Sequence, residues 1–249
     1  MADSDAVYKA LPSEPDAPAP EAERIAPLTV DDGLVKSEHR LGDTVAMYAA
    51  CIGMAIISLV SIALVIFDEP WELPWVSAHI ILNPIALLLF VPAIIVLQPT
   101  SQAATKATGL ARHQLLALPA LAFVTLGTLA IVLHKTLNHK AHFRSWHGTI
   151  GIGIYAWLAI QAAFGGATVW FGGAAFGGGL KPKLMWKYHR LSGYVLFPLL
   201  MLTTALGGAS HWAQKLLPAS VRLIIYGIGS TVVLASVLVR LRPSKMKFW

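Results

Sequence analysis

The sequence has few charged residues and almost no acidic residues beyond its first third. Charged residues make up 13% of the 249 residues, whereas soluble domains carry about 25%. Nine of the thirteen acidic residues lie within residues 1–40, and the last acid along the chain is Glu72. Paired-carboxylate hydrolysis and carboxylate proton relays are therefore excluded from the later two thirds of the chain.

Cysteine is nearly absent as well. The single cysteine, Cys51, lies in an apolar segment, so the chain has neither a disulfide framework nor a thiolate metal site. The glycine-rich stretch 165–179 is not followed by a Gly-Lys-Ser/Thr signature, which excludes a phosphate-binding loop of that type. We interpret most of this stretch as a flexible connection.

What the sequence has in abundance is hydrophobic residues, at 56% of the chain with a mean hydropathy of +0.63. An α-helix needs about 20 apolar residues to cross a hydrocarbon core of about 30 Å. Six runs of that kind occur, and the prolines inside them are tolerated as kinks in a membrane bundle. The sequence therefore predicts an all-α integral membrane protein with six transmembrane helices, at about 45–67, 76–97, 112–133, 146–168, 189–209 and 220–241.

The chain divides into a tail, one membrane domain and a short end. Residues 1–40 are acidic and rich in proline and lack the basic start and apolar core of a signal peptide, so we expect a disordered tail. We place the membrane domain at 41–242 and a short basic tail at 243–249.

Basic residues distinguish the two faces of the predicted bundle. Positively charged loops are retained on the cytoplasmic side of a membrane. One face carries Lys36, Arg40, Lys106, Arg112, Lys181, Lys183, Lys187, Arg190, Arg240, Arg242, Lys245 and Lys247. The other face carries Lys135, Lys140, Arg144, Lys215 and Arg222, together with the acids Asp68, Glu69 and Glu72. Both termini are therefore expected to be cytoplasmic.

Four of the nine histidines occupy equivalent places. His79, His113, His147 and His189 fall within the first turn or so of the second to fifth predicted helices. An ionisable side chain inside a membrane is costly and is by default a functional candidate. For each histidine taken singly, a structural hydrogen bond to a neighbouring helix is an alternative.

The alternation of helix direction sorts these histidines into two pairs. His79 and His147 are expected near the non-cytoplasmic side, and His113 and His189 near the cytoplasmic side. Two imidazoles from facing helices are the axial ligands of a six-coordinate b-type haem, and bundle cores accommodate such cofactors. The sequence thus predicts a four-helix core that holds two haems about 20 Å apart in depth.

The settings of these histidines resemble the cytochrome b561 family. The resemblance rests on "SAHIILNP" around His79, "ARHQLL" around His113, "HKTLNHKAHFRSWHGTIG" leading into His147 and "KYHRLSGYVL" around His189. It covers roughly residues 45–242 and is greatest with the short six-helix branch. The resemblance implies transfer of electrons from cytosolic ascorbate, through both haems, to monodehydroascorbate radical or ferric chelates on the other side.

Basic residues next to the haem ligands are candidates for binding ions. On the cytoplasmic side, cations would attract anionic ascorbate or pair with haem propionates, with setting of topology as the alternative role. We assign Arg112 and Arg190 to the cofactor and Lys106 and Lys187 to the substrate. On the far side, the candidates for binding the acceptor are His134, Lys135 and His142, and the alternatives are a solvated loop or a metal site of His134, His139 and His142.

Two rival functions remain open at this stage. A metal or small-solute transporter could use the intramembrane histidines as ligands or proton acceptors. A haem-bearing subunit could instead pass its electrons to a partner protein. We expect a lipid bilayer and small redox molecules as partners and no nucleic acid, and we leave open a homodimer and the choice between endomembrane, vacuolar and plasma membrane.

Overall fold

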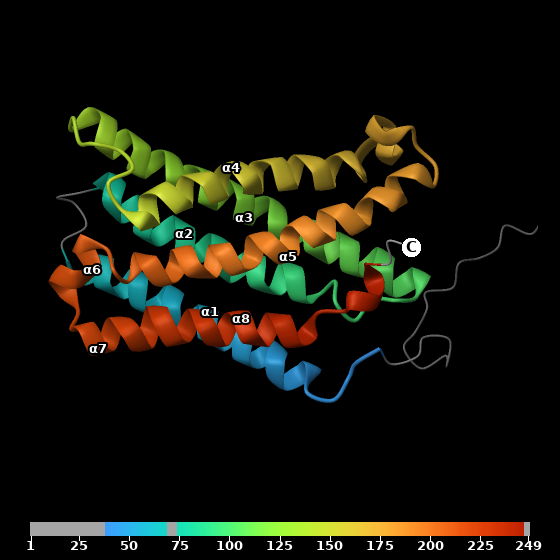
Figure 1. The fold of residues 1–249 in the computed structure, drawn as a ribbon, viewed down its shortest axis with the longest axis horizontal. Coiled ribbons are helices and arrows are strands. Elements are labelled where there is room, and N and C mark those ends of the chain that lie inside the picture. The colour runs from blue at the N-terminus through green and yellow to red at the C-terminus, as the bar shows by residue number, and fades with distance from the viewer. Residues whose placement is uncertain (1–37, 69–73, 247–249) are drawn as a thin grey trace, which may run out of the picture. The chain divides into compact units, whose positions relative to one another are not determined.

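A computed structural model of the protein describes residues 38–68 and 74–246, and these residues form a helical bundle (Figure 1). Six helical spans are long and apolar enough to cross a membrane, which confirms the predicted all-α class and the six runs. Five are α1 (Asp43–Phe67), α2 (Pro74–Ile95), α3 (Ala103–Leu137), α4 (Trp146–Ala167) and α5 (Lys181–Gly207). The sixth is built from α7 (Ala219–Arg222), the π-helical η2 (Leu223–Ile228) and α8 (Gly229–Arg240).

Three short helices complete the described chain. They are η1 (Trp170–Phe176), α6 (His211–Leu216) and η3 (Pro243–Lys245). The glycine-rich stretch after α4 forms η1 and a turn in which Gly172, Gly173 and Gly177 adopt positive φ angles. That conformation is open to glycine at little cost. Most of the predicted acidic tail, at 1–37, lies outside the described residues.

The expected position of two histidines at helix starts is wrong. His79 and His147 lie within the first two turns of α2 and α4, but α3 begins ten residues before His113 and α5 begins eight residues before His189. Apolar runs mark where a helix enters the membrane, whereas the helix itself continues outward through polar residues that form helix readily. Both histidines therefore lie in the third turn of longer helices.

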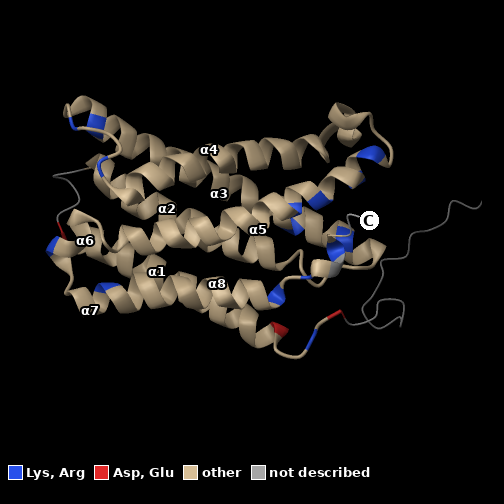
Figure 2. Ribbon diagram, in the orientation of Figure 1, with Lys and Arg blue, Asp and Glu red and all other residues tan. Residues whose placement is uncertain are grey.

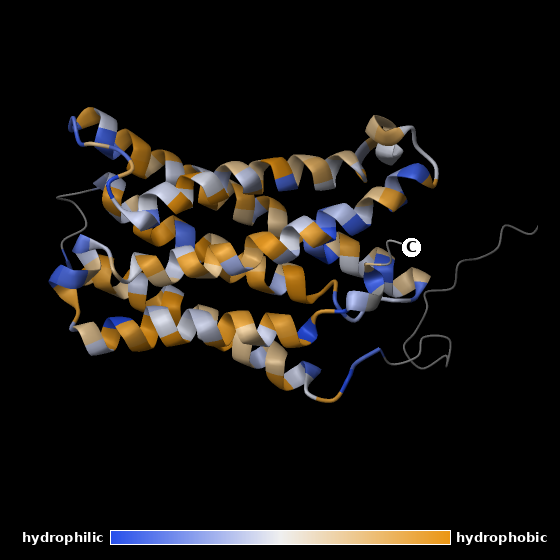
Figure 3. Cartoon of the chain, viewed as in Figure 1, coloured by the Kyte–Doolittle hydropathy of each residue, from blue (hydrophilic) through white to orange (hydrophobic). Residues whose placement is uncertain are grey.

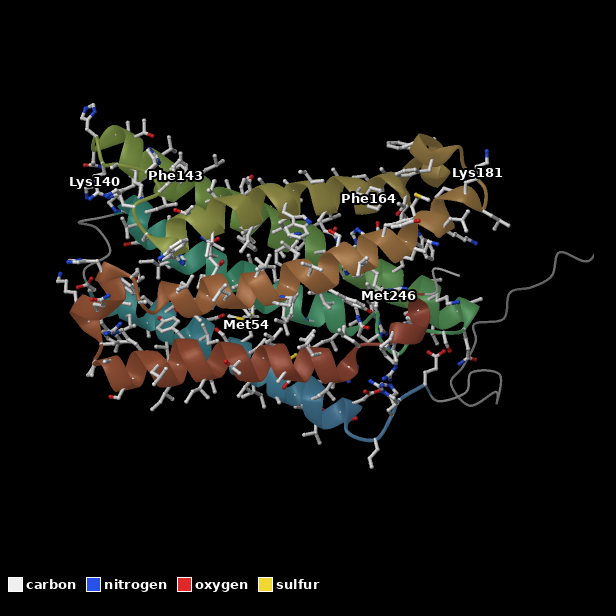
Figure 4. The ribbon with its side chains drawn as sticks, viewed as in Figure 1. Met54, Lys140, Phe143, Phe164, Lys181 and Met246 are labelled. Atoms are coloured by element: carbon white, nitrogen blue, oxygen red, sulfur yellow. The ribbon has the colours of Figure 1, made fainter. Side chains whose placement is uncertain are left out.

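The bundle has two ends, which we name by the described chain. The terminal face contains its first and last residues, Glu38 and Met246, with the α2–α3 and α4–α5 connections, and the far face contains the α3–α4 connection and α6. Figure 4 shows Lys140 and Phe143 at the far face and Lys181 and Met246 at the terminal face. Lysine and arginine gather towards these two ends (Figure 2), and the stretch between them is predominantly hydrophobic (Figure 3).

The helices pack closely around α1 and only loosely between α3 and α4. Helix α1 packs against α2 and α8, with Met54, Ile57 and Val233 almost fully buried in the core between them. Helices α2 and α3 form one tight antiparallel hairpin, and α4 and α5 form a second. The second hairpin touches the first mainly along α3 and α4, and only sparingly. His79 and His113 of the first hairpin face His147 and His189 of the second.

A buried ion pair and two hydrogen bonds join the start of α1 to the end of α8 at the terminal face. The Asp43 carboxylate is buried at the start of α1 and pairs with Arg242, while Arg240, only 2% exposed, donates to the Asp43 backbone carbonyl. Arg40 donates to the carbonyl of Val239 at the end of α8. Removing one partner from a buried pair is costly because it leaves an uncompensated charge. These contacts fix the two ends of the described chain beside each other.

Candidate haem site

The four helix histidines form two pairs between the hairpins. The ring centroids of His79 on α2 and His147 on α4 lie 6.1 Å apart, with an angle of 82° between the ring planes. Those of His113 on α3 and His189 on α5 lie 6.5 Å apart at 78°. Each pair takes one histidine from each hairpin, as the alternation of helix direction predicts. We call His79 and His147 the far pair and His113 and His189 the terminal pair.

Three of the four rings are held by a backbone carbonyl of the other helix in their own hairpin. His79 Nδ1 lies 2.9 Å from the Gly127 carbonyl oxygen, His113 Nδ1 2.9 Å from that of Ala93, and His147 Nδ1 2.9 Å from that of Thr203. A carbonyl oxygen can only accept, so the proton resides on Nδ1 of each ring. The unprotonated Nε2 is then the nitrogen available to a metal, which is the usual arrangement of a metal-binding histidine.

A constant register produces these contacts. The accepting carbonyl lies fourteen residues after the histidine of its own helix, from His79 to Ala93, from His113 to Gly127 and from His189 to Thr203. At about 1.5 Å of rise per residue, fourteen residues span about 21 Å. The two pairs are therefore separated by about two thirds of the hydrocarbon thickness.

The fourth ring, His189, departs from this pattern. The same register would place the Gln161 carbonyl opposite it, but His189 Nδ1 is buried without a hydrogen-bond partner among the described residues. Instead, the Gln161 side chain donates to the His189 backbone carbonyl at 2.6 Å. The ring stacks beside Phe164 with centroids 6.3 Å apart, and a Cβ atom added to Gly165 would lie 2.5 Å from its Cε1. Packing therefore positions this ring.

These pairs fit the axial ligation of a haem. A metal–imidazole bond of about 2 Å on each side of one iron would place two ring centroids about 6 Å apart. The observed separations of 6.1 and 6.5 Å agree with that requirement. No hydrogen bond joins Nε2 of any of the four rings to another residue in the described part of the chain. Both pairs thus have the spacing and the free nitrogens that a bis-imidazole haem needs.

Residues 76–214, which include all four histidines, match the family described as eukaryotic cytochrome b561. The match covers more than half of the chain. The protein belongs to the cytochrome b561 family. This membership confirms the resemblance read from the histidine settings, and it implies a b-type haem as the cofactor.

A curated relative of this cytochrome b561 protein is the transmembrane reductase CYB561D2 of Bos taurus. The two are 34% identical over 136 residues, which span 51% of this chain and 54% of the relative. The match thus spans only about half the length of the relative. No solved structure matches the chain. The name of the relative describes a membrane reductase, which is consistent with an oxidoreductase site between the hairpins.

The predicted cations of the terminal face differ in their surroundings. Arg112 and Lys106 are exposed on α3. The Lys187 ammonium lies 5.2 Å from the centroid of the neighbouring Tyr188 ring. Arg190, next to His189, donates through Nη1 to the backbone carbonyl of Lys245 at 2.7 Å. Arg190 thus joins α5 to the C-terminal segment beside the terminal pair.

Lys245 lies in η3, and its backbone carbonyl accepts the hydrogen bond from Arg190. Its Nζ donates to the Leu97 carbonyl at 2.7 Å and to Thr100 Oγ1 at 3.0 Å, so η3 is fixed on the α2–α3 connection. Burial, together with the nearby charges of Arg190 and Lys106, lowers the pKa of Lys245 to about 8, against the influence of Glu38. Lys245, Arg190 and Lys106 form what we call the terminal cation cluster.

On the far face, the structure brings some of the predicted side chains close to the far pair. Lys135 is near enough to His79 and His147 to interact with both electrostatically. His134 is 6% exposed, and its Nε2 accepts from Lys140 Nζ at 3.2 Å. His142 Nε2 lies 3.5 Å from the Thr136 hydroxyl. Among the candidates on this face, Lys135 is therefore the one that interacts electrostatically with both histidines of the far pair.

The hypothetical metal site of His134, His139 and His142 is not formed in the structure. Among residues 38–68 and 74–246, no group of three or more His, Cys, Asp or Glu side chains is placed to hold a metal ion. His139 is exposed in the α3–α4 connection and adopts a positive φ of 51°. The lysine contact of His134 also opposes cation binding there, because a metal ion would be repelled by the ammonium group.

Proposed function

We propose that this cytochrome b561 protein transfers electrons across a membrane through two b-type haems, one at each histidine pair. The donor is cytosolic ascorbate, and the acceptor is monodehydroascorbate radical or a ferric chelate on the opposite side. Both termini are cytoplasmic in this proposal, so the terminal pair receives the electron and the far pair delivers it.

The observation that carries the proposal is the presence of two equivalent imidazole pairs about 21 Å apart along the bundle. Each pair has centroid separations suited to one iron, and three of the four rings have their donor nitrogen directed by a carbonyl. A haem bound at a pair would supply a reversible one-electron couple. The chain contributes the axial nitrogens, their orientation and an apolar surrounding that excludes water.

The terminal cation cluster supports ascorbate as the donor. Ascorbate is a monoanion at neutral pH, so Lys245, Arg190 and Lys106 would attract it to the edge of the terminal pair. Arg190 is adjacent to His189 in sequence and is fixed by the carbonyl of Lys245. Lys187 and Arg112 extend the same positive surface along α5 and α3. These residues would orient the donor next to the cofactor rather than react with it.

Lys135 supports an anionic acceptor at the far face. Its charge acts on both rings of the far pair. Both monodehydroascorbate and many ferric chelates are anions, which the ammonium group would hold close to the outgoing electron. His134 near the end of α3 and His142 in the α3–α4 connection stay candidates for contacts with the acceptor.

Transfer into sealed vesicles tests the proposal. Purified protein is reconstituted into vesicles loaded with ascorbate, and a ferric chelate that cannot cross the bilayer is added outside with a ferrous indicator. Ferrous iron should form outside, and it should not form in vesicles without protein or with His147→Ala protein. Equal rates from wild-type and His147→Ala vesicles would contradict the proposal, as would a purified protein without haem absorbance.

A further inference from the structure

An indole nitrogen is one of the buried polar atoms in the terminal half of the bundle that lack a protein partner. The indole Nε1 of Trp186 on α5 is buried, and it has no hydrogen bond to any residue in the described ranges. An indole N–H can only donate, and a buried donor without an acceptor costs about 1–3 kcal/mol. Such a group in a native protein calls for an acceptor from outside the chain.

Three of the other tryptophans contrast with Trp186. Trp157 Nε1 donates to Ser192 Oγ at 2.8 Å, Trp170 to Gln114 at 3.2 Å and Trp212 to the Asp68 carboxylate at 3.1 Å. Three indoles in connections and helices of the same bundle thus have side-chain acceptors. Unlike these three, Trp186 has no acceptor among the described residues.

The register of α5 places Trp186 beside the ligand. Trp186 and His189 are three residues apart and so share one face of the helix. Because α5 runs inward from the terminal face, Trp186 lies nearer that face than His189 by about 4.5 Å. Along α5, Trp186 thus lies between His189 and the terminal face.

Haem b carries two propionate carboxylates on one edge, and buried carboxylates need donors and cations. The terminal face supplies the cations in Arg190, Lys245 and Lys106. We propose that Trp186 binds the haem of the terminal pair by donating its indole N–H to a propionate oxygen. This inference rests on the proposed function, since it needs a haem at that pair.

Loss of this donor would change the cofactor more than the fold. A hydrogen bond to a propionate disperses its negative charge, so its removal favours ferric over ferrous haem. A net hydrogen-bond contribution of about 0.5–1.5 kcal/mol corresponds to a change of about threefold to tenfold in the ratio of ferrous to ferric haem. The far pair should not respond.

The test compares Trp186→Phe with Trp157→Phe in full-length, haem-loaded protein. Spectroelectrochemical titration should show two haems in both variants, and at a fixed ambient potential the ferrous-to-ferric ratio of the terminal haem should fall about threefold to tenfold only in Trp186→Phe. His147→Ala protein, which retains the terminal haem, assigns the signal. The propionate bending band in the resonance Raman spectrum should shift in the same variant.

A second variant separates the hydrogen bond from the shape of the side chain. Trp186→Gln restores an N–H donor, and it should return the ratio towards the wild-type value even if Trp186→Phe loses haem. Unchanged titration and Raman spectra in Trp186→Phe would overturn this inference, as would a Gln variant that behaves like Phe. Haem-free wild-type protein would instead overturn the proposed function.

Discussion

The far pair and the terminal pair have similar ring separations but differ in how the rings are held. In the far pair, carbonyls of Gly127 and Thr203 fix both imidazoles through Nδ1. In the terminal pair, only His113 has such a carbonyl, and His189 is placed by contact with Gly165 and Phe164. The far site is thus positioned by hydrogen bonds and the terminal site partly by close packing.

The charged surroundings of the two histidine pairs also differ. The terminal pair lies below the terminal cation cluster, which several segments distant in sequence assemble. The far pair is influenced electrostatically by Lys135. A site that depends on packing and on assembled loops is more sensitive to small changes than one fixed by the helix register. Substitutions at both pairs test that difference.

Removing one ligand from each pair should give opposite kinetic results. His113→Ala and His147→Ala should each reduce haem from about two to about one per chain, because bis-imidazole ligation needs both rings. Ascorbate should then reduce the remaining haem rapidly in His147→Ala and poorly in His113→Ala, as measured by stopped-flow absorbance. His211→Ala, at an exposed position of α6, is the control. Rapid reduction in both variants would refute the assignment of donor and acceptor ends.

Adding one methyl group opposite each pair should affect the terminal site alone. A Cβ atom at Gly165 would lie 2.5 Å from His189 Cε1, whereas one at Gly207 would lie 3.5 Å from His147 Cε1. The first is a clash and the second is an ordinary contact. Gly165→Ala should therefore lose most of the terminal haem, and Gly207→Ala should keep both, as measured by haem per chain. Gly153→Ala, which meets no atom within 4 Å, controls for helix propensity.

Much of this arrangement follows from local sequence patterns, and the rest depends on distant contacts. Apolar runs predicted the six spans. The alternation of helix direction predicted that His79 lies near His147 and that His113 lies near His189. They did not predict that α3 and α5 begin well before their histidines, because hydropathy marks the membrane boundary and not the helix end. The π-helical turn at Leu223–Ile228 also has no signal in the apolar pattern.

The terminal cation cluster shows the limit most clearly. Lys245 acts on the α2–α3 connection almost 150 residues earlier in the chain, through two hydrogen bonds. In the sequence alone, Lys245 is only one of several basic residues near the C-terminal end. Likewise, the buried pair of Asp43 and Arg242 joins opposite ends of the described chain, and neither residue carries a motif. Such contacts arise from tertiary packing and cannot be read from residue spacing.

The lowered pKa of Lys245 predicts how donor binding depends on pH. Burial and neighbouring cations lower this pKa from 10.5 to about 8, so the ammonium is charged below pH 8 and loses its proton above it. Attraction of an anionic donor should then weaken, and the KM for ascorbate should rise through pH 8. The effect on stability has the opposite sign. Because the pKa of Lys245 is lower in the folded state, about 8, than its ordinary value of 10.5, deprotonation favours the folded state. Attachment of η3 should therefore strengthen as the pH rises from 8 to 10.5.

Variants at Lys245 separate this titration from others. Lys245→Arg keeps a charge at every accessible pH, so the rise in KM near pH 8 should disappear. Lys245→Gln should raise the KM at pH 7 by about threefold to tenfold, since a partly screened cation contributes about 1 kcal/mol to anion binding. Steady-state rates at pH 6 to 9 provide the measurement. An unchanged pH profile in Lys245→Arg would exclude Lys245 from the donor site.

The smallest expected effects are the losses of stability on removal of Glu38, at the terminal face, and of Asp68, at the far face. Glu38 accepts from the backbone and side chains of Ser101 and Gln102 at the start of α3, and although burial opposes the shift, these bonds lower its pKa to about 2. Glu38→Ala should cost about 1 kcal/mol, as for loss of a helix cap. Asp68→Ala, which loses the Trp212 bond and a longer pair with Lys215, should cost less.

Thermal unfolding of the detergent-solubilised variants measures both effects. Because the folded pKa of Glu38 lies below its ordinary value of 4.5, its contribution is fully present above pH 4.5 and is lost as the pH falls through about 2. The difference between wild type and Glu38→Ala should accordingly shrink on acidification. A difference that persists unchanged at pH 2 would show that the carboxylate is not responsible.

The ratio of haem to chain in the purified wild-type protein decides whether both histidine pairs bind haem. Extraction of the haem as its pyridine complex, with protein quantified by amino-acid analysis, should give about two b-type haems per chain and a low-spin, bis-imidazole absorbance spectrum before extraction. A ratio near one would contradict the claim of two equivalent stations, and a folded protein without haem would contradict the account as a whole.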